Sequence, residues 1–522
     1  MLLWLVLSCS DGNQEVLQEQ TSQTPSQDTV QSQPTSGHQA KSQSNVQGSP
    51  NNGVGPNGQV IHKGHSPGPG HSPNGGPPQG MSGGMKPEPF HADVTFEWTQ
   101  PEATWSTESK SVIWISLDTV YAKRMSVYGG PALVPNLEDF SENAVVFDHA
   151  ISHFPETALS HWTMMSSILP EVHGNVPANG GSLYTGPTIA DIAKAHDYAT
   201  GGFIGGVTMT DQASGFGRGF DVYDDQFTFS FEDMSREGKE VTQRAVTWIQ
   251  AQGEGEYVAF AHYFDAHFPY TPKNNLYDPD YTGEIDGTDA VLRPYRDGQK
   301  TPSQRDVQHV LALYDAEITE LDTKITPLLN MADENTIVVV TADHGESFSH
   351  DYYFNHRAGL WDEVTHVPLI IGGGGLKGSR VSQQIGLIDI LPTVLDIAKL
   401  PSDKRFMGTS RVDWILGDSD IHPEAVYSIT DPWMPGPQFA VRTEEYKWID
   451  GVQQDWVYNL QIDPAEETNL KSVPSSISTA KETYQALVES HVKWQVVSPR
   501  KRQISDEECK RLMALGYTTC MQ

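Results

Sequence analysis

The chain has 522 residues, of which 37% are hydrophobic, and its formal net charge is −33. That length allows two or three domains, or one large α/β domain with additions, and the low hydrophobic share indicates a sizeable unstructured part. The negative field repels nucleic acid and anionic lipid headgroups, which excludes both as expected partners. An anionic substrate therefore needs local compensation, and a bound metal ion is the expected source.

The first nine residues predict export. Residues 1–9 are apolar but far shorter than the ~20 residues that cross a bilayer, which is typical of a secretory signal. Ser8 directly before Cys9 resembles the bacterial lipobox, although Val6 stands where leucine is usual. We expect Cys9 to carry a lipid and to tether the protein to the cell envelope, in the periplasm or at the surface. A plain signal peptide and secretion is the alternative.

Residues 10–108 read as a disordered linker. Gln, Ser, Pro, Gly and Asn dominate this stretch as far as residue 89, and it has no aromatic side chain before Phe90. Such a segment buries too little apolar surface to offset its conformational entropy. Two more cysteines, Cys509 and Cys520, lie near the other end. In an exported protein they either close a small disulfide loop or remain two separate thiols.

Strand and helix patterns alternate from residue 109 onward. Residues 111–117, 256–264 and 335–343 are continuous apolar runs, as expected of strands buried on both faces. Helical patterns lie between them at residues 136–144, 188–196 and 303–332. This alternation predicts an α/β fold, a three-layer αβα sandwich around a mostly parallel sheet. We assign residues 109–420 to this catalytic domain.

The pattern changes after the helix predicted at residues 389–400. Short runs typical of antiparallel strands follow, and then a helix around residues 478–493. Residues 421–522 therefore read as a smaller C-terminal α+β subdomain.

Acidic residues stand where the predicted parallel strands end. Asp118 and Asp265 directly follow the first two apolar runs, and Asp343 ends the third. Ligands bind at the carboxyl ends of the strands in such sheets. Asp118, Asp343, His344 and the hydroxyl of Thr157 together form a plausible ligand set for a divalent ion. Two carboxylates with one imidazole favour Zn²⁺ or Mn²⁺, with Ca²⁺ as the alternative.

Several longer segments resemble the sulfatase family of the alkaline phosphatase superfamily. The similarity extends over roughly residues 109–520, and it is carried by segments that include PETALSHWTMMSSILPEVHG, HYFDAHFPY, TADHGESFSHDYYFNHRAGLWDEVTHVPLII and YNLQIDPAEETNL. The resemblance implies that Asp118, Asp343 and His344 are metal ligands and that Thr157 occupies the nucleophile position.

The same resemblance implies roles for further residues. His267 matches a histidine that contacts the substrate, and His356 lies where relatives carry a leaving-group residue or a ligand of a second metal. With Asp265 these two histidines form an alternative two-metal site, although one ion is the first expectation. His161, in the nucleophile segment, is expected to contact the oxyanion or the leaving group.

The chain departs from the sulfatase pattern at three points. The family motif C/S-x-P-S-R is replaced by T-A-L-S-H, so Thr157 stands for the oxidisable Cys or Ser and His161 for the arginine. Thr119 replaces the usual second aspartate, and no GKWH-like segment is found. A secondary alcohol cannot become the aldehyde of the sulfatase mechanism, which favours direct attack by Thr157 on phosphate or phosphonate esters.

The prediction is therefore a metal-dependent hydrolase of small anionic phosphate, phosphonate or sulfate esters, with phosphomonoesters or phosphodiesters favoured over sulfate esters. The metal activates the Thr157 hydroxyl, which is otherwise a weak nucleophile. Two alternatives stay open, a transferase that passes a phosphoryl headgroup to an acceptor and a degenerate relative that acts as a surface binding protein.

Overall fold

The computed structural model describes residues 90–99, 110–174, 181–182, 184–227, 235–417, 424–430, 438–451 and 454–491. The predicted signal, Cys9, Cys509 and Cys520 lie outside these residues. None of the described helices combines the length and the apolar character that a membrane crossing needs.

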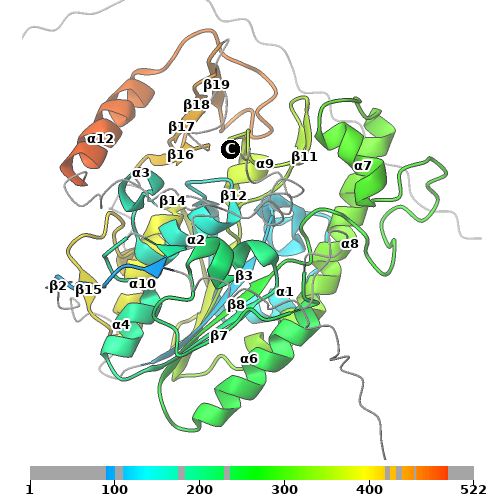
Figure 1. Cartoon of the computed structure of the whole chain (residues 1–522). Coiled ribbons are helices and arrows are strands. Elements are labelled where there is room, and N and C mark those ends of the chain that lie inside the picture. The colour runs from blue at the N-terminus through cyan, green and yellow to red at the C-terminus, as the bar shows by residue number, and fades with distance from the viewer. Residues whose placement is uncertain are drawn as a thin grey trace, which may run out of the picture. The chain divides into compact units, whose positions relative to one another are not determined.

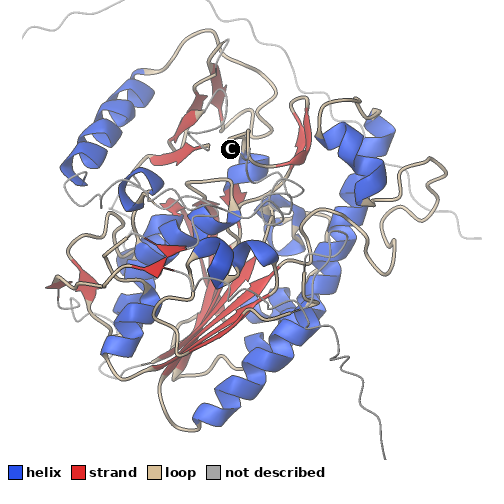
Figure 2. Cartoon of the chain, in the orientation of Figure 1, coloured by secondary structure: helices blue, strands red, loops and turns tan. Residues whose placement is uncertain are grey.

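A nine-stranded mixed sheet forms the centre of the catalytic domain (Figures 1 and 2). Its order is β12-β4-β13-β9-β3-β8-β6-β7, and β14 pairs in parallel with β4. The strands are β3 (Ser111–Leu117), β4 (Ala144–Ile151), β6 (Ala199–Ile204), β7 (Val222–Asp224), β8 (Tyr257–Tyr263), β9 (Thr336–Thr341), β12 (His366–Val367), β13 (Leu369–Gly373) and β14 (Ser379–Gly386).

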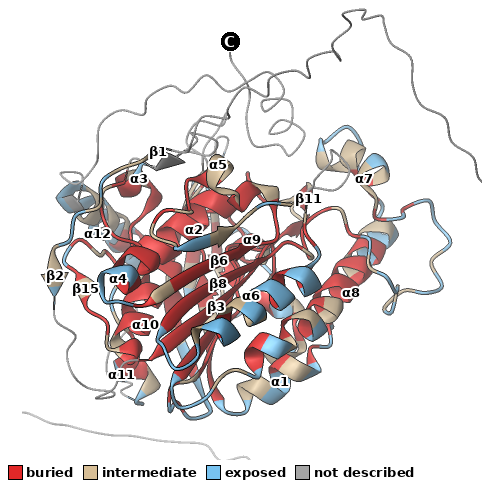
Figure 3. Cartoon of the chain, turned by 60° about the horizontal axis from the view of Figure 1, so that its bottom comes forward, coloured by how far each residue is buried: buried red, intermediate tan, exposed pale blue. Residues whose placement is uncertain are grey.

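The middle of this sheet is parallel and buried. β3 pairs in parallel with both β8 and β9, and all seven of its residues are buried. Helices cover both faces (Figure 3), which explains why these strands read as continuous apolar runs. On one side α1 (Pro135–Ser141) and α6 (Gly238–Gln252) contact the sheet, and α8 (Gln304–Leu329) packs against both of them. On the other side lie α4 (Ile189–Ala195), which contacts the sheet, and α2 (Thr157–Ser166) and α10 (Ile390–Ala398), which contact each other. The predicted three-layer sandwich is confirmed.

The C-terminal subdomain is an antiparallel sheet with one helix packed on it. Strands β16 (Val426–Ile429), β17 (Phe439–Arg442), β18 (Tyr446–Ile449) and β19 (Trp456–Asn459) pair in chain order, and α12 (Ser475–His491) packs against β17 and β18. The ring of Tyr484 of α12 packs at a tilt against the rings of Tyr427 and Phe439. These elements correspond to the short strands and the helix expected from the sequence.

Buried charges join this small sheet to the catalytic domain. Asp362 accepts hydrogen bonds from Arg442 of β17 and, at 2.8 Å, from the ammonium of Lys447 of β18. Lys447 is 1% exposed and also lies 2.9 Å from Glu466. Because these charges are buried away from water, each one is stabilised mainly by its oppositely charged partners.

Removing Lys447 should therefore destabilise the protein strongly. We expect Lys447→Ala to lower the free energy of unfolding by about 3 kcal/mol, because it leaves the Asp362 and Glu466 carboxylates undercompensated. Urea titration followed by tryptophan fluorescence measures this loss. Lys471→Ala, at an exposed position, is the matched control and should change it by less than about 0.5 kcal/mol.

Residues 91–99 correct the linker prediction. β2 (Trp98–Thr99) pairs with β15 (Ser402–Asp403), and the guanidinium of Arg405 donates to the hydroxyl and carbonyl oxygens of Thr95. The ring of Trp98 also stacks on Phe96. This part of residues 10–108 is therefore attached to the catalytic domain, because aromatic side chains return to the sequence at this point.

Candidate active site

Two carboxylates meet at the carboxyl edge of the parallel sheet. Asp118 directly follows β3, and Asp343 lies two residues after β9. The two strands are neighbours, with Ser116 opposite Thr341, so both aspartates leave the sheet side by side. One ligand atom from each of Asp118, Asp343 and His344 lies within 4.8 Å of the others. No other trio of this kind is found among the described residues.

The polar atoms of this trio fit a divalent ion. Asp118 Oδ1, Asp343 Oδ2 and His344 Nε2 are buried and make no hydrogen bond of good geometry, and the last two atoms lie 3.2 Å apart. Buried polar atoms are rarely left unpaired, so three that converge indicate a bound group. The Nδ1–H of His344 donates to the carbonyl of Gly345 at 3.0 Å, which leaves the Nε2 lone pair for a metal. A set of two carboxylates and one imidazole suits Zn²⁺ or Mn²⁺.

Burial makes two neighbouring carboxylates electrostatically unfavourable unless their charges are compensated. It raises the pKa of Asp118 to about 7, against the opposing effect of His344. The pKa of Asp343 is also raised, first by burial and then by the charge of Asp118. Two buried like charges this close repel each other unless a proton or a cation lies between them.

Thr157 points its hydroxyl at this group. It is the first residue of α2, fully buried, and its Oγ1 donates to Asp118 Oδ2 at 3.3 Å. Glu156 caps the helix by accepting from the N–H of Leu159, which fixes where the helix begins. The nucleophile position therefore lies at the positive end of a helix dipole, where developing negative charge is stabilised.

His262 contacts Asp118 through a hydrogen bond, although the sequence did not identify it as a site residue. It lies within β8, opposite Ser116 of β3, and its Nε2 is 3.1 Å from Asp118 Oδ2. Burial lowers the pKa of His262 to about 4, so a neutral ring with the proton on Nε2 donates this bond. The signal that could have identified His262 is the presence of a histidine inside an otherwise apolar strand.

His161 is engaged by the protein on both ring nitrogens. Its Nδ1–H donates to the carbonyl of Thr157 at 2.6 Å, and its Nε2 lies 2.8 Å from the hydroxyl of Ser116. Burial lowers the pKa of His161 to about 3, so the neutral ring accepts from Ser116. This geometry makes His161 a support for the first turn of α2, and its predicted oxyanion contact requires one of these bonds to break.

His267 and His356 lie together beside the candidate metal group, which is the trio of Asp118, Asp343 and His344. Their ring centroids are 5.5 Å apart, and the ring of His356 stacks on His344 at 4.3 Å. The Nδ1–H of His267 donates to the carbonyl of Phe268, which leaves its buried Nε2 without a partner. Nδ1 of His356 lies 3.2 Å from Glu346, a buried acid that also accepts from Tyr270. These contacts orient both rings.

Asp265 does not join the two histidines. Its Oδ1 lies 2.6 Å from the ammonium of Lys324 on α8 and accepts from the N–H of Gly238. The alternative of a second ion held by Asp265, His267 and His356 is therefore not assembled. The Asp265 carboxylate faces α6 and α8 instead, where the ammonium of Lys324 already balances its charge.

Glu317 near this ion pair gives a pH prediction. Burial raises its pKa to about 8, so the folded state binds a proton that the unfolded state releases near pH 4.5. The resulting stabilisation is complete below pH 4.5 and is lost as the pH rises to 8. Between pH 5 and 8.5 this effect should lower the free energy of unfolding of the wild type by on the order of 1–3 kcal/mol. We expect Glu317→Gln to remove this decrease, which chemical unfolding at each pH measures. Glu334→Gln, at an exposed position beyond the same helix, is the control and should keep the pH-dependent loss of stability.

Thr119 adopts an unusual backbone conformation next to the metal group. Its φ is 60°, which is rare for a β-branched residue. Its N–H donates to Asp343 Oδ1, its own hydroxyl donates to the carbonyl of Asp118, and its carbonyl accepts from Tyr314. Thr119 thus fixes the loop after β3 but brings no carboxylate to the site.

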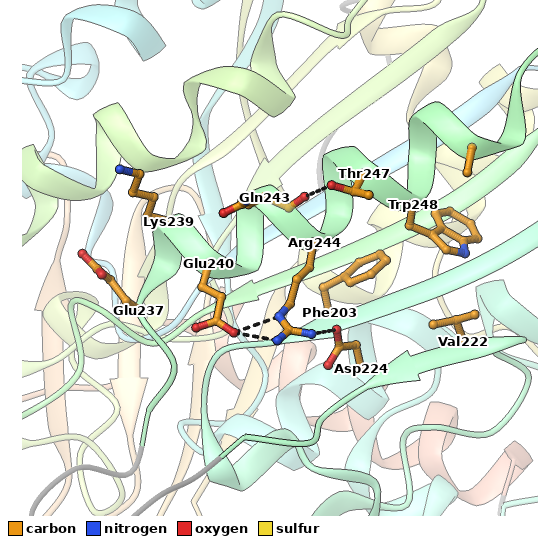
Figure 4. Close-up of a pocket in the computed structure, with 11 residues that line it drawn as sticks. Phe203, Val222, Asp224, Glu237, Lys239, Glu240, Gln243, Arg244, Thr247 and Trp248 are labelled. Carbon is orange, nitrogen blue, oxygen red and sulfur yellow. Dashed lines mark hydrogen bonds and ion pairs between the residues drawn. The ribbon is translucent and has the colours of Figure 1, made fainter. Parts of the chain in front are cut away.

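A separate hollow lies along the edge strand β7 and the helix α6 (Figure 4). Several of its charges are paired, since Arg244 pairs with Asp224 and Glu240, and Glu237 pairs with Lys273. It shares no lining residue with the metal group, so it belongs to the surface at the edge of the sheet.

The family model described as Sulfatase matches residues 110–400, more than half of the chain. The protein therefore belongs to the sulfatase family of the alkaline phosphatase superfamily. The region that the family model matches includes the whole metal group, Thr157 and both flanking histidines. The expected family is confirmed.

Curated relatives are similar over part of their length. Arylsulfatase K of Gallus gallus is 26% identical over 292 residues, which is 44% of this chain and 51% of that protein. The Delta 4,5-hexuronate-2-O-sulfatase of Bacteroides thetaiotaomicron is 28% identical over 172 residues, or 31% of this chain and 35% of that protein. The chain thus spans about half or less of these relatives.

Solved structures share the fold. A protein in complex with its substrate D-glucosamine-2-N,6-O-disulfate has a TM-score of 0.60 at 18% identity, covering 74% of this chain and 98% of that one. The phosphonate monoester hydrolase of Agrobacterium radiobacter has a TM-score of 0.59 at 17% identity, covering 73% and 96%. One fold therefore serves both sulfur and phosphorus esters.

Proposed function

We propose that this protein is a metal-dependent hydrolase of phosphate, phosphonate or sulfate esters, with Thr157 as its nucleophile. The observation that carries the proposal is the hydrogen bond of 3.3 Å from Thr157 Oγ1 to Asp118, a carboxylate of the only trio of described residues arranged to hold a metal. Membership of the sulfatase family supports ester hydrolysis as the reaction class.

Different residues of the chain have separate roles in the proposed reaction. When bound by Asp118, Asp343 and His344, a divalent ion supplies the charge that lowers the pKa of the Thr157 hydroxyl and polarises the ester oxygen. Thr157 Oγ1 loses its proton to the solvent and attacks phosphorus or sulfur in line. The bond to the alcohol breaks, the departing oxygen takes up a proton from the solvent, and the group is left on Thr157. Water then hydrolyses this threonine ester. The N-terminus of α2 stabilises the negative charge that develops near Oγ1.

We assign His267 and His356 to the leaving group, since the two rings lie 5.5 Å apart and His356 stacks on His344. His356 receives support from Glu346 at 3.2 Å, so its other nitrogen is available to the departing oxygen. His262 keeps the Asp118 carboxylate turned toward Thr157. We assign phosphorus esters as the preferred substrates, because an unmodified threonine attacks directly, without the aldehyde that sulfatases use.

Turnover of a panel of nitrophenyl esters tests this function. We expect the purified protein with Zn²⁺ or Mn²⁺ to hydrolyse nitrophenyl phosphate, bis-nitrophenyl phosphate or a nitrophenyl phosphonate faster than nitrophenyl sulfate. Acid quenching during turnover should trap a covalent adduct on the peptide that contains Thr157, detectable by mass spectrometry. Bound metal without turnover of any ester would contradict hydrolysis and favour a binding protein, and release of product only with an added alcohol would favour a transferase.

We also propose that the protein is exported and anchored by a lipid on Cys9. The apolar residues 1–8 and the Ser8-Cys9 pair support this placement. Metabolic labelling with a fatty acid should mark the full chain expressed in a bacterial host, and Cys9→Ser should abolish the label. A wild-type chain that is exported without label would contradict the anchor.

A further inference from the structure

The loop after β3 holds a β-branched residue in a costly conformation. Thr119 is fully buried and has a φ of 60°, in the left-handed region. The Cβ of a branched residue crowds the backbone there, so the conformation costs free energy and persists only where the surroundings hold it. Thr119 directly follows Asp118. Any relaxation of its backbone would therefore move the chain at the candidate metal group.

One buried hydroxyl, that of Tyr314 on α8, holds this loop. It donates to the carbonyl of Thr119 at 2.5 Å and accepts from the N–H of Tyr121 at 2.9 Å. The Tyr314 ring packs against the rings of Tyr270 and Phe348, with centroid distances of 5.7 and 5.0 Å, which fixes where the hydroxyl lies. Because a buried backbone group without a partner costs free energy, the loop is held in the conformation that makes both bonds.

The strained backbone turns a hydrogen-bond donor toward a candidate metal ligand. The N–H of Thr119 donates to Asp343 Oδ1 at 3.3 Å, and the N–H of His344 donates to the same oxygen at 2.9 Å. With Oδ1 held by two backbone donors, Oδ2 is the oxygen that faces His344 Nε2, at 3.2 Å. The residue after one ligand aspartate thus orients the carboxylate of the other.

We propose that Thr119, held in the left-handed conformation by Tyr314, is a positioning residue that orients the Asp343 carboxylate toward the metal ion. The hydroxyl of Thr119 is engaged with the carbonyl of Asp118, so the group that reaches Asp343 is the backbone N–H. A position where the family usually has a second aspartate here supplies a neutral donor. The inference rests on the metal site of the proposed function and deepens it.

The metal affinity of Tyr314→Phe tests the inference without turnover. Phenylalanine keeps the ring and removes the hydroxyl, so Thr119 can leave the left-handed region and withdraw its N–H from Asp343. We expect the dissociation constant for Zn²⁺ to rise by about 10- to 100-fold, as for the loss of other groups that orient a ligand. Competition between the full chain and a chromophoric chelator measures this constant, and circular dichroism reports whether the variant is folded.

Thr119→Gly offers a rescue that a merely structural role of Tyr314 would not allow. Glycine has no Cβ to crowd the backbone at positive φ, and it keeps the N–H, so the single variant should bind Zn²⁺ within about threefold of the wild type. Added to Tyr314→Phe, Thr119→Gly should restore most of the lost affinity, because the conformation no longer needs to be held. A double variant as weak as Tyr314→Phe, or weaker, would overturn the inference.

Tyr128→Phe is the matched control. The hydroxyl of Tyr128 makes the same pair of bonds with Leu369 of β13, donating to its carbonyl at 3.2 Å and accepting from its N–H at 2.9 Å. These bonds hold β13 rather than the loop after β3, so we expect the Zn²⁺ affinity to stay within about threefold of the wild type. Wild-type affinity in Tyr314→Phe, or an equal loss in Tyr128→Phe, would contradict the positioning role.

These binding measurements separate the inference from the proposed hydrolysis. If the wild type binds Zn²⁺ but cleaves no ester, and Tyr314→Phe weakens binding while Thr119→Gly restores it, the positioning role stands and hydrolysis fails. A wild type that binds neither Zn²⁺ nor Mn²⁺ would overturn the inference. If Tyr314→Phe does not fold, a crystal structure of the wild type with Zn²⁺ decides. Positive φ at Thr119 with its N–H on Asp343 supports the role, and negative φ overturns it.

Discussion

Thr157→Ala should lower kcat on the best nitrophenyl ester by about 10³-fold or more while metal content stays near that of the wild type. The alanine removes the attacking oxygen but none of the charged ligand atoms, and loss of a nucleophile typically costs this much or more. Steady-state kinetics with parallel metal analysis measures both quantities. Thr157→Ser, which keeps the hydroxyl, should stay within about tenfold of the wild type.

A second threonine on the same helix provides the control. Thr163 is also buried in α2, and its hydroxyl donates to the carbonyl of Leu159. Thr163→Ala therefore removes the same hydroxyl from the same helix without touching the metal group. Full turnover by Thr157→Ala, or an equal loss in both variants, would exclude the covalent mechanism.

Asp343→Asn should abolish metal binding and turnover together. The amide keeps the shape of the side chain but removes one of the two charges that hold the ion, and we expect metal affinity to fall by roughly 10³-fold. The metal-free variant should be more stable than the metal-free wild type, because burial and the nearby Asp118 already disfavour the Asp343 carboxylate. Thermal unfolding with and without Zn²⁺ measures both effects.

Asp265→Asn distinguishes the one-ion site from the two-ion alternative. Asp265 also follows a central strand, but Lys324 neutralises it. We expect its amide variant to keep the metal content and to lose stability instead. A loss of one ion from a wild type that binds two would restore Asp265 as a ligand.

The main sheet and the metal trio could be predicted from the sequence for one physical reason. Strands buried on both faces have continuous apolar runs, and parallel strands end at a common edge. The sequence therefore predicts that Asp118 and Asp343 converge. The family resemblance added Thr157, which no periodicity places at that edge.

The contacts that the sequence did not reveal depend on side-chain direction. Asp265 lies two residues after its strand, as Asp343 does, yet it faces Lys324. His262 is hidden inside β8, where polar residues are usually structural, and only the register with β3 brings it to Asp118. The pairing of residues 91–99 with the catalytic domain depends equally on distant partners, such as Arg405.

An anomalous-scattering map of crystals grown with Zn²⁺ or Mn²⁺ tests the central claim most directly. The account predicts one strong peak within bonding distance of Asp118, Asp343 and His344, with Thr157 Oγ1 facing it. Ordered ligand side chains with no peak between them, or a peak held by other residues, would contradict it.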